Sequence, residues 1–138
     1  MTRTGLRAFD GCLIVFCVVL VVLVGLLLAL PYYLRANGNR KAGQSVRKAA
    51  GWTEVQLRDK AVDGVLTAKE ARDSVAGGIV IGYVPAARPG DRVQVTVHYS
   101  VVWGWVPVGG EVSKCFRFSV EPQARPRPAV SRKEIDCP

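Results

Sequence analysis

The chain has 138 residues, a formal net charge of +8 at pH 7 and a hydrophobic fraction of 49%. This length has room for one small domain beside a membrane segment. A net positive charge of this size is typical of a protein that binds anionic lipid headgroups or anionic polymers. The basic residues are spread along the chain without a nucleic-acid recognition motif, so we expect no nucleic-acid partner.

An uncharged stretch runs from Gly11 to Leu34, after a short N-terminal tail of residues 1–10. At a rise of about 1.5 Å per residue, roughly 20 such residues match the ~30 Å hydrocarbon core of a bilayer. Tyr32, Tyr33 and Arg35 stand at the far end, where an aromatic belt and a membrane-interface charge belong. We therefore expect a single-pass transmembrane helix over residues 11–34, with the lipid bilayer as its first partner.

A cleavable signal peptide, a lipid-anchored cysteine and a buried soluble helix fit the apolar stretch less well. It is longer than the core of a signal peptide, and Leu34-Arg35-Ala36 is a poor cleavage context. Cys17 follows Phe16, and no hydrophobic run precedes Cys12, so neither matches a lipid-anchored cysteine. A buried helix of a soluble protein is rarely apolar on every face over this length.

Two opposing signals bear on the orientation of this helix. Basic residues are more numerous on its C-terminal flank, which taken alone places that side in the cytoplasm. A pair of cysteines in the C-terminal part and a tail of only ten residues before the span favour the opposite orientation. We expect localisation at the cell membrane with an extracytoplasmic C-terminal domain.

Residues 35–78 are expected to form a basic helical linker. Its first part can extend the membrane helix over the headgroups, with an interruption at Asn37-Gly38. The capping-box pattern Thr53-Glu54-Val55-Gln56 predicts a short helix that ends near Asp63-Gly64. Thr67-Ala68-Lys69-Glu70 repeats the pattern and predicts a second helix that ends at Gly77-Gly78.

From residue 79 the hydrophobic period changes to two, which predicts a small antiparallel β domain over residues 79–138. Strands are predicted at 79–84, 92–101, 111–121 and 130–135, with a turn at 88–91 and a polyproline-like connector at 122–128. The positions expected to be buried are Val93, Val95, Val97, Tyr99, Val101, Val112, Phe116, Phe118 and Val120. The fold class is therefore α+β: an N-terminal transmembrane helix, a short helical linker and a small antiparallel sheet.

Cys115 and Cys137 are the only cysteines outside the membrane segment. A disulfide between them would close a loop of roughly 20 residues and add ~3 kcal/mol by restricting the unfolded chain. Alternation places Cys115 on the sheet face away from the main core, where the returning tail can reach it. Two free thiols in a cytoplasmic domain are the alternative. Two cysteines and a distant His98 lack the spacing of metal ligands, so no metal and no cofactor is expected.

Two patterns resemble chemical sites. The segment from Asp59 to Glu70 matches the spacing of an EF-hand calcium loop, but Ala61 stands where the loop needs a carboxylate. A helix that ends and restarts explains the same residues. His98 is the only histidine and occupies an ordinary position on a polar strand face. We therefore expect no catalytic residues, no enzymatic activity and no small-molecule substrate.

Trp103 and Trp105 flank Gly104 at a predicted strand end. Exposed aromatic side chains of this kind mark contact with a partner or with a membrane interface. The alternative is that both rings cover a small core. Trp103 and Trp105 are therefore candidate partner-contact residues.

The chain resembles small single-pass actinobacterial proteins of unknown function, which share a β-rich end closing on a Cys-Pro pair such as Cys137-Pro138. It also resembles TadE-like pilin proteins in Phe9-Asp10-Gly11, in the strand from Pro89 to Tyr99 and in the turn from Val106 to Gly110. The acidic residue that these pilins carry early in the helix is absent. From the anchor and the charge we expect a non-enzymatic envelope module that contacts a protein partner or an anionic envelope polymer. The second resemblance implies a minor pilin or a secretion-system component.

Overall fold

The computed structural model describes residues 4–105 and 108–138. The elements in chain order are helix α1 (Thr4–Lys60), the 3-10 helix η1 (Ala61–Asp63), helix α2 (Ala68–Asp73) and strands β1 (Ile79–Val84), β2 (Val93–Trp103), β3 (Gly110–Glu121) and β4 (Ala129–Ile135). A long apolar N-terminal helix is thus followed by a four-stranded antiparallel sheet in the order β1-β2-β3-β4. The α+β prediction is confirmed.

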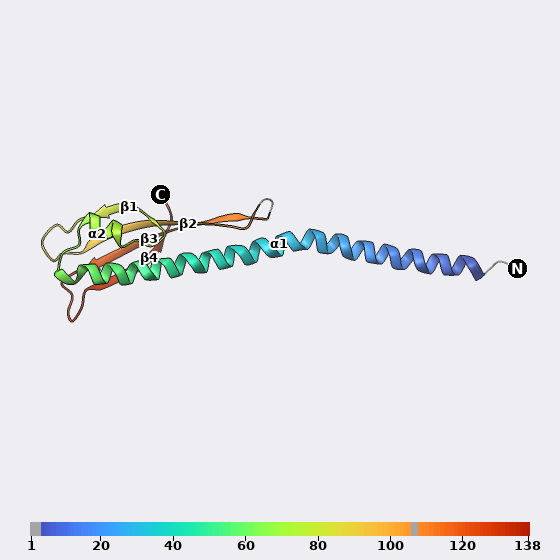
Figure 1. Ribbon diagram of the computed structural model, residues 1–138, viewed down its shortest axis with the longest axis horizontal. Coiled ribbons are helices and arrows are strands. Elements are labelled where there is room, and N and C mark those ends of the chain that lie inside the picture. The colour runs from blue at the N-terminus through green and yellow to red at the C-terminus, as the bar shows by residue number, and fades with distance from the viewer. Residues whose placement is uncertain (1–3, 106–107) are drawn as a thin grey trace.

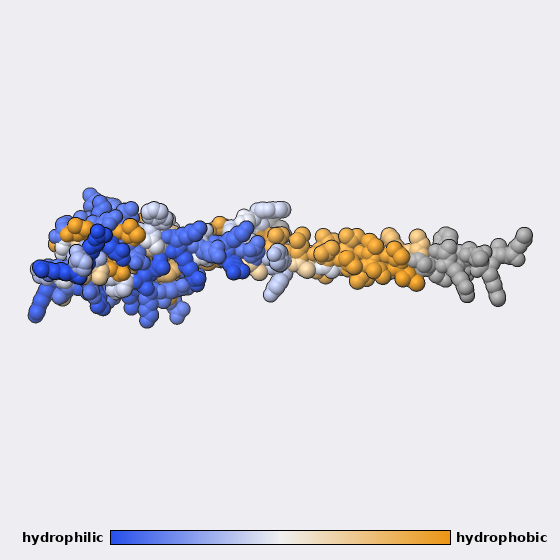
Figure 2. Space-filling view, turned by 90° about the horizontal axis from the view of Figure 1, so that it is seen from below, coloured by the Kyte–Doolittle hydropathy of each residue, from blue (hydrophilic) through white to orange (hydrophobic). Residues whose placement is uncertain are grey.

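Helix α1 has 57 residues and two different environments. Its N-terminal half projects alone, while its C-terminal part lies along one face of the sheet (Figure 1). Side chains from Cys12 to Leu34 are exposed, and most of them form the apolar band of Figure 2. Within the described residues, α1 is the one helix long and apolar enough to cross a membrane. Pro31 lies inside it and offers no backbone N–H, which is compatible with the shallow change of direction near the middle of α1 in Figure 1.

Two predictions about this region are wrong. Helix α1 continues without a break through Asn37-Gly38, and no new helix begins at Thr53, which lies inside α1 with its side chain buried. A glycine costs a helix only about 1 kcal/mol, and tertiary packing on the C-terminal side outweighs that cost. Residues 35–60 are helical as expected. From Ala42 onward, however, this helix supplies part of the domain core instead of a separate linker.

The core lies between α1 and the helix-facing side of the sheet. Val46, Ala50 and Leu57 of α1 are fully buried, as is Phe118 of β3. In the pairing of β2 with β3, Val97 stands opposite Phe116 and Val95 opposite Phe118, so that β-branched and aromatic side chains meet across the strands. The predicted strands are confirmed, and β2 extends two residues further than expected. Of the predicted core positions on β2 and β3, only Val101 and Val112 are half-buried instead of buried.

The helix ends follow local rules. After η1, Gly64 adopts a left-handed conformation with φ 85°, which favours glycine. Thr67 caps α2: its hydroxyl accepts a hydrogen bond from the Glu70 N–H at 3.2 Å, and a Glu70 carboxylate oxygen accepts one from the Thr67 N–H at 2.8 Å. This second capping box is confirmed, although α2 ends at Asp73, before the predicted glycines.

The connector between β3 and β4 differs from its prediction. The chain turns directly after β3, and the Ala124 N–H donates to the Glu121 carbonyl at 3.3 Å. An extended polyproline-like path over residues 122–128 is therefore wrong. Antiparallel neighbours require the chain to reverse direction, and the prolines lie within that reversal.

Candidate functional site

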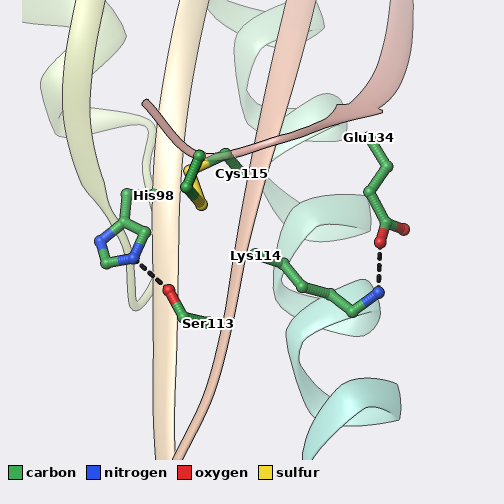
Figure 3. Close-up of a disulfide and its surroundings, with 6 residues drawn as sticks. His98, Ser113, Lys114, Cys115 and Glu134 are labelled. Atoms are coloured by element: carbon green, nitrogen blue, oxygen red, sulfur yellow. Dashed lines mark hydrogen bonds and ion pairs between the residues drawn. A yellow bond between two sulfur atoms is a disulfide. The ribbon is translucent and has the colours of Figure 1, made fainter.

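The predicted disulfide joins β3 to the C-terminal tail. Cys115 and Cys137 are bonded, with their Cα atoms 5.1 Å apart. Ile135 of β4 pairs with Cys115, so the chain leaves β4 beside that residue and crosses the sheet face, as Figure 3 shows. Cys115 is fully buried beneath this tail, whereas Cys137 is exposed. The tail therefore covers Cys115 on the face of the sheet that α1 leaves open.

His98 lies next to this disulfide. In the register of β2 and β3, His98 pairs with Cys115, and its Nε2 atom is hydrogen-bonded to the Ser113 hydroxyl (Figure 3). Ligand atoms of His98, Cys115 and Cys137 all lie within 4.8 Å of one another, so the expectation of a distant histidine is wrong. The antiparallel register of the two predicted strands, counted from the hairpin turn, could have placed His98 opposite Cys115. Zinc binds cysteine as thiolate, and sulfur atoms joined in a disulfide no longer offer that ligand.

The contact between His98 and Ser113 pairs a base with a hydroxyl group. A serine nucleophile of the triad type also needs a third group that orients the histidine. Among the residues that the structure describes, no carboxylate is hydrogen-bonded to the His98 ring. The two side chains stand on neighbouring strands of the sheet face that α1 leaves open.

Ion pairs fix the edge strand β4 to its neighbours. Lys114 of β3 is hydrogen-bonded to Glu134, and Arg47 of α1 lies 3.9 Å from the same carboxylate. The Lys114 ammonium is the main cause that lowers the pKa of Glu134 below its usual value. Arg132 reaches back to α1, where its guanidinium donates to the Arg47 carbonyl at 3.3 Å and lies 4.0 Å from Glu54. These contacts hold β4 against β3 and α1.

Five basic residues, here called the basic collar, follow the apolar stretch along α1, and the last of them lie beside the sheet. Its members are Arg35, Arg40, Lys41, Arg47 and Lys48. From Gly11 to Thr53 the sequence contains no acidic residue. Of the collar residues, all within the described part of the chain, Arg47 alone forms an ion pair. Figure 2 shows the apolar band giving way to hydrophilic surface here.

The two tryptophans of the hairpin between β2 and β3 have different roles. The Trp103 indole lies on α1, and its Nε1–H donates to the Asn39 Oδ1 atom at 2.8 Å. A Cβ atom added at Gly38 would stand 2.2 Å from a Trp103 ring carbon, so glycine is what lets the ring lie there. Trp105, in contrast, is 76% exposed. Sequence reasoning treated both as one feature and missed the role of Gly38.

The remaining predicted residues fall in separate places. Tyr32 and Tyr33 are exposed on α1 at the end of the apolar stretch, next to Arg35. In the calcium-like segment, Glu70 is engaged by Thr67, and an Asp63 carboxylate oxygen accepts from the Val65 N–H at 3.3 Å. The interpretation as a helix that ends and restarts is confirmed. Two residues of the pilin-like turn, at 106 and 107, lie outside the described residues, as do the side chains of residues 9–11.

Comparison of the chain with protein-family models, with curated proteins and with solved structures finds no match.

Proposed function

We propose that this chain is a non-enzymatic, membrane-anchored envelope module that crosses the membrane once. The observation that carries the proposal is that α1 has two roles: one part of it can span a membrane, and another part belongs to the domain core. From Cys12 to Leu34 it is apolar and exposed on every side, and its C-terminal part buries one face against the sheet through residues such as Val46 and Leu57. A lipid core removes such an apolar surface from water. The anchor and the domain then share one helix, which holds the domain at a fixed height above the bilayer.

The C-terminal domain is proposed to lie outside the cytoplasm. Support comes from the disulfide between Cys115 and Cys137, because such bonds persist in oxidising compartments. The basic flank of α1 argues for the opposite side by charge count. In this proposal the basic collar has another role, which is to bind an anionic partner.

An anionic envelope polymer is the partner class that the collar supports best. Four of its five charges have no ion pair within the described residues, and the span from Arg35 to Lys48 covers about 20 Å of helix. A row of unpaired positive charges attracts a linear polyanion or an acidic protein surface, with strong dependence on salt.

The test is binding of a glycerol-phosphate polymer to the full chain in nanodiscs of zwitterionic lipid. Arg40→Gln with Lys41→Gln should weaken binding roughly tenfold or more, since each charge near an anionic surface contributes about 1 kcal/mol. The matched control is Arg125→Gln with Arg127→Gln, which removes the same charge from the loop between β3 and β4. Equal losses from the two double variants, or none from either, would contradict a specific role for the collar.

A minor pilin or secretion-system component is the second candidate. The observation in its favour is the unbroken course of α1 from Thr4 to Lys60, which gives copies of the chain a long apolar helix for side-by-side packing. The resemblance to TadE-like pilins points the same way. Sequencing of the mature N-terminus decides: cleavage after Gly5 or Gly11 supports a processed pilin, and an intact N-terminus opposes it.

A further inference from the structure

We propose that the end of the hairpin between β2 and β3 is a second membrane contact. In this proposal Trp105 and Val102 rest in the headgroup region of the bilayer that α1 crosses. The inference depends on the proposed membrane span of α1 and holds for either orientation of that span. The occupant of this exposed apolar surface is then the lipid itself.

The direction of β2 carries the first step. Tyr99 is hydrogen-bonded to Thr53, while Trp103, four residues later, is hydrogen-bonded to Asn39. Strand β2 therefore runs antiparallel to α1, toward the apolar half of the helix. Figure 1 shows the hairpin end reaching along α1 beyond the rest of the sheet in the same direction.

The height of Trp105 carries the second step. A strand rises about 3.3 Å per residue, so Trp105 lies up to roughly 7 Å beyond Trp103. On a helix with a rise of about 1.5 Å, this distance corresponds to four or five residues before Asn39. At full extension, Trp105 therefore reaches the level of Leu34 and Arg35, where the uncharged stretch ends.

The chemistry of the hairpin end carries the third step. Val102 and Trp105 are each 76% exposed, and neither is required by the domain core. Gly104, with φ 72°, turns the chain so that Trp105 leaves the alternation of β2 and does not follow Trp103 onto the helix. Tryptophan favours the headgroup level of a bilayer, where its ring meets apolar chains and its N–H meets polar groups. Tyr32 and Tyr33, exposed on α1 at a similar level, would belong to the same aromatic belt.

The experiment measures tryptophan quenching by lipids brominated near the headgroup end of the acyl chain. The full chain is reconstituted in vesicles of these lipids as three variants that all keep Trp103. Trp52→Phe retains Trp105, Trp105→Phe retains Trp52, and the double variant retains neither. Differences between them isolate the emission of Trp105 and of Trp52. Trp52 is the internal control, because it is exposed on α1 about 28 Å beyond Tyr33.

The proposal expects the Trp105 emission to fall roughly twofold or more, and the Trp52 emission to stay unchanged. If the protein floats with the vesicles but Trp105 is no more quenched than Trp52, the inference is overturned, while the membrane span stands. A blue shift of Trp105 only when an envelope protein is added would overturn it in favour of a protein partner. If the protein does not float with the vesicles, the proposed membrane span of α1 is wrong, and the inference about Trp105, which depends on that span, is wrong as well.

Discussion

The Tyr99 hydroxyl donates a hydrogen bond to the Thr53 hydroxyl oxygen at 2.7 Å, across 46 residues of sequence. Both side chains are buried, and the Ala76 N–H donates to the same Thr53 oxygen at 3.3 Å. One hydroxyl group therefore joins the middle of β2, the loop after α2 and the helix α1. This contact fixes the sheet on the helix that also carries the apolar stretch.

Removing the Tyr99 hydroxyl tests this contact. Tyr99→Phe should lower the free energy of unfolding of the domain by about 1 kcal/mol, because a buried hydrogen bond is lost while the ring stays in place. The measurement is urea unfolding of the full chain in detergent micelles, followed by near-ultraviolet circular dichroism. Tyr32→Phe is the control, since Tyr32 is 80% exposed outside the domain and should leave the transition unchanged.

Alkaline pH should destabilise the same region. Burial raises the pKa of Tyr99 above its ordinary value of 10.0. The unfolded chain therefore loses this proton at a lower pH than the folded chain. The contribution of the protonated Tyr99 to folding stability is fully present below the unfolded pKa of about 10. It is lost as pH rises through the higher pKa of the folded chain. We expect the midpoint of urea unfolding to fall above pH 10 in the natural chain and to fall less in Tyr99→Phe. Identical pH dependence of the midpoint in the two chains would contradict this role of Tyr99.

Loss of the disulfide should destabilise the domain. Cys137→Ser opens a bridge between residues 22 apart in sequence. The chain-entropy estimate for a loop of this size is roughly 3 kcal/mol, which should appear as a lower midpoint of thermal unfolding. Cys17→Ser is the control, because Cys17 is a free cysteine in the apolar stretch. A Cys137→Ser midpoint equal to that of the control would contradict a structural role for the bridge.

Two glycines of α1 should respond to alanine in opposite directions. Gly43 has nothing within 4 Å of an added Cβ, so Gly43→Ala should stabilise the helix by up to about 1 kcal/mol through helix propensity. Gly38→Ala gains the same propensity but pushes the Trp103 ring off the helix. Trp103 emission should then shift toward longer wavelength in a Trp52→Phe background. A Gly38→Ala spectrum like that of Gly43→Ala would show that the ring does not rest on Gly38.

The strands could be predicted from sequence because each long strand has one buried face, and Val95, Val97 and Tyr99 alternate with polar residues. The disulfide was predictable for a related reason, since alternation places Cys115 on the face that the tail crosses. The second capping box was predictable because both of its partners, Thr67 and Glu70, are local.

What could not be predicted depends on partners that are distant in sequence. Thr53 and Thr67 begin the same local pattern, yet the Thr53 hydroxyl binds Tyr99 and Ala76 from inside a helix. Asn37-Gly38 has the composition of a helix break, but the Trp103 ring occupies the space that Gly38 leaves. In both places a tertiary contact overrides the local preference of the chain, and a single sequence does not display that contact.

The most direct test of the anchored, extracytoplasmic domain is thiol labelling of intact cells in a background with Cys12→Ser and Cys17→Ser. Cys137 is exposed and bonded to Cys115, so an impermeant maleimide should not react before reduction and should react after treatment with an impermeant phosphine. Labelling that requires lysis of the cells, with no need for reduction, would contradict both the disulfide and the placement of the domain outside the cytoplasm.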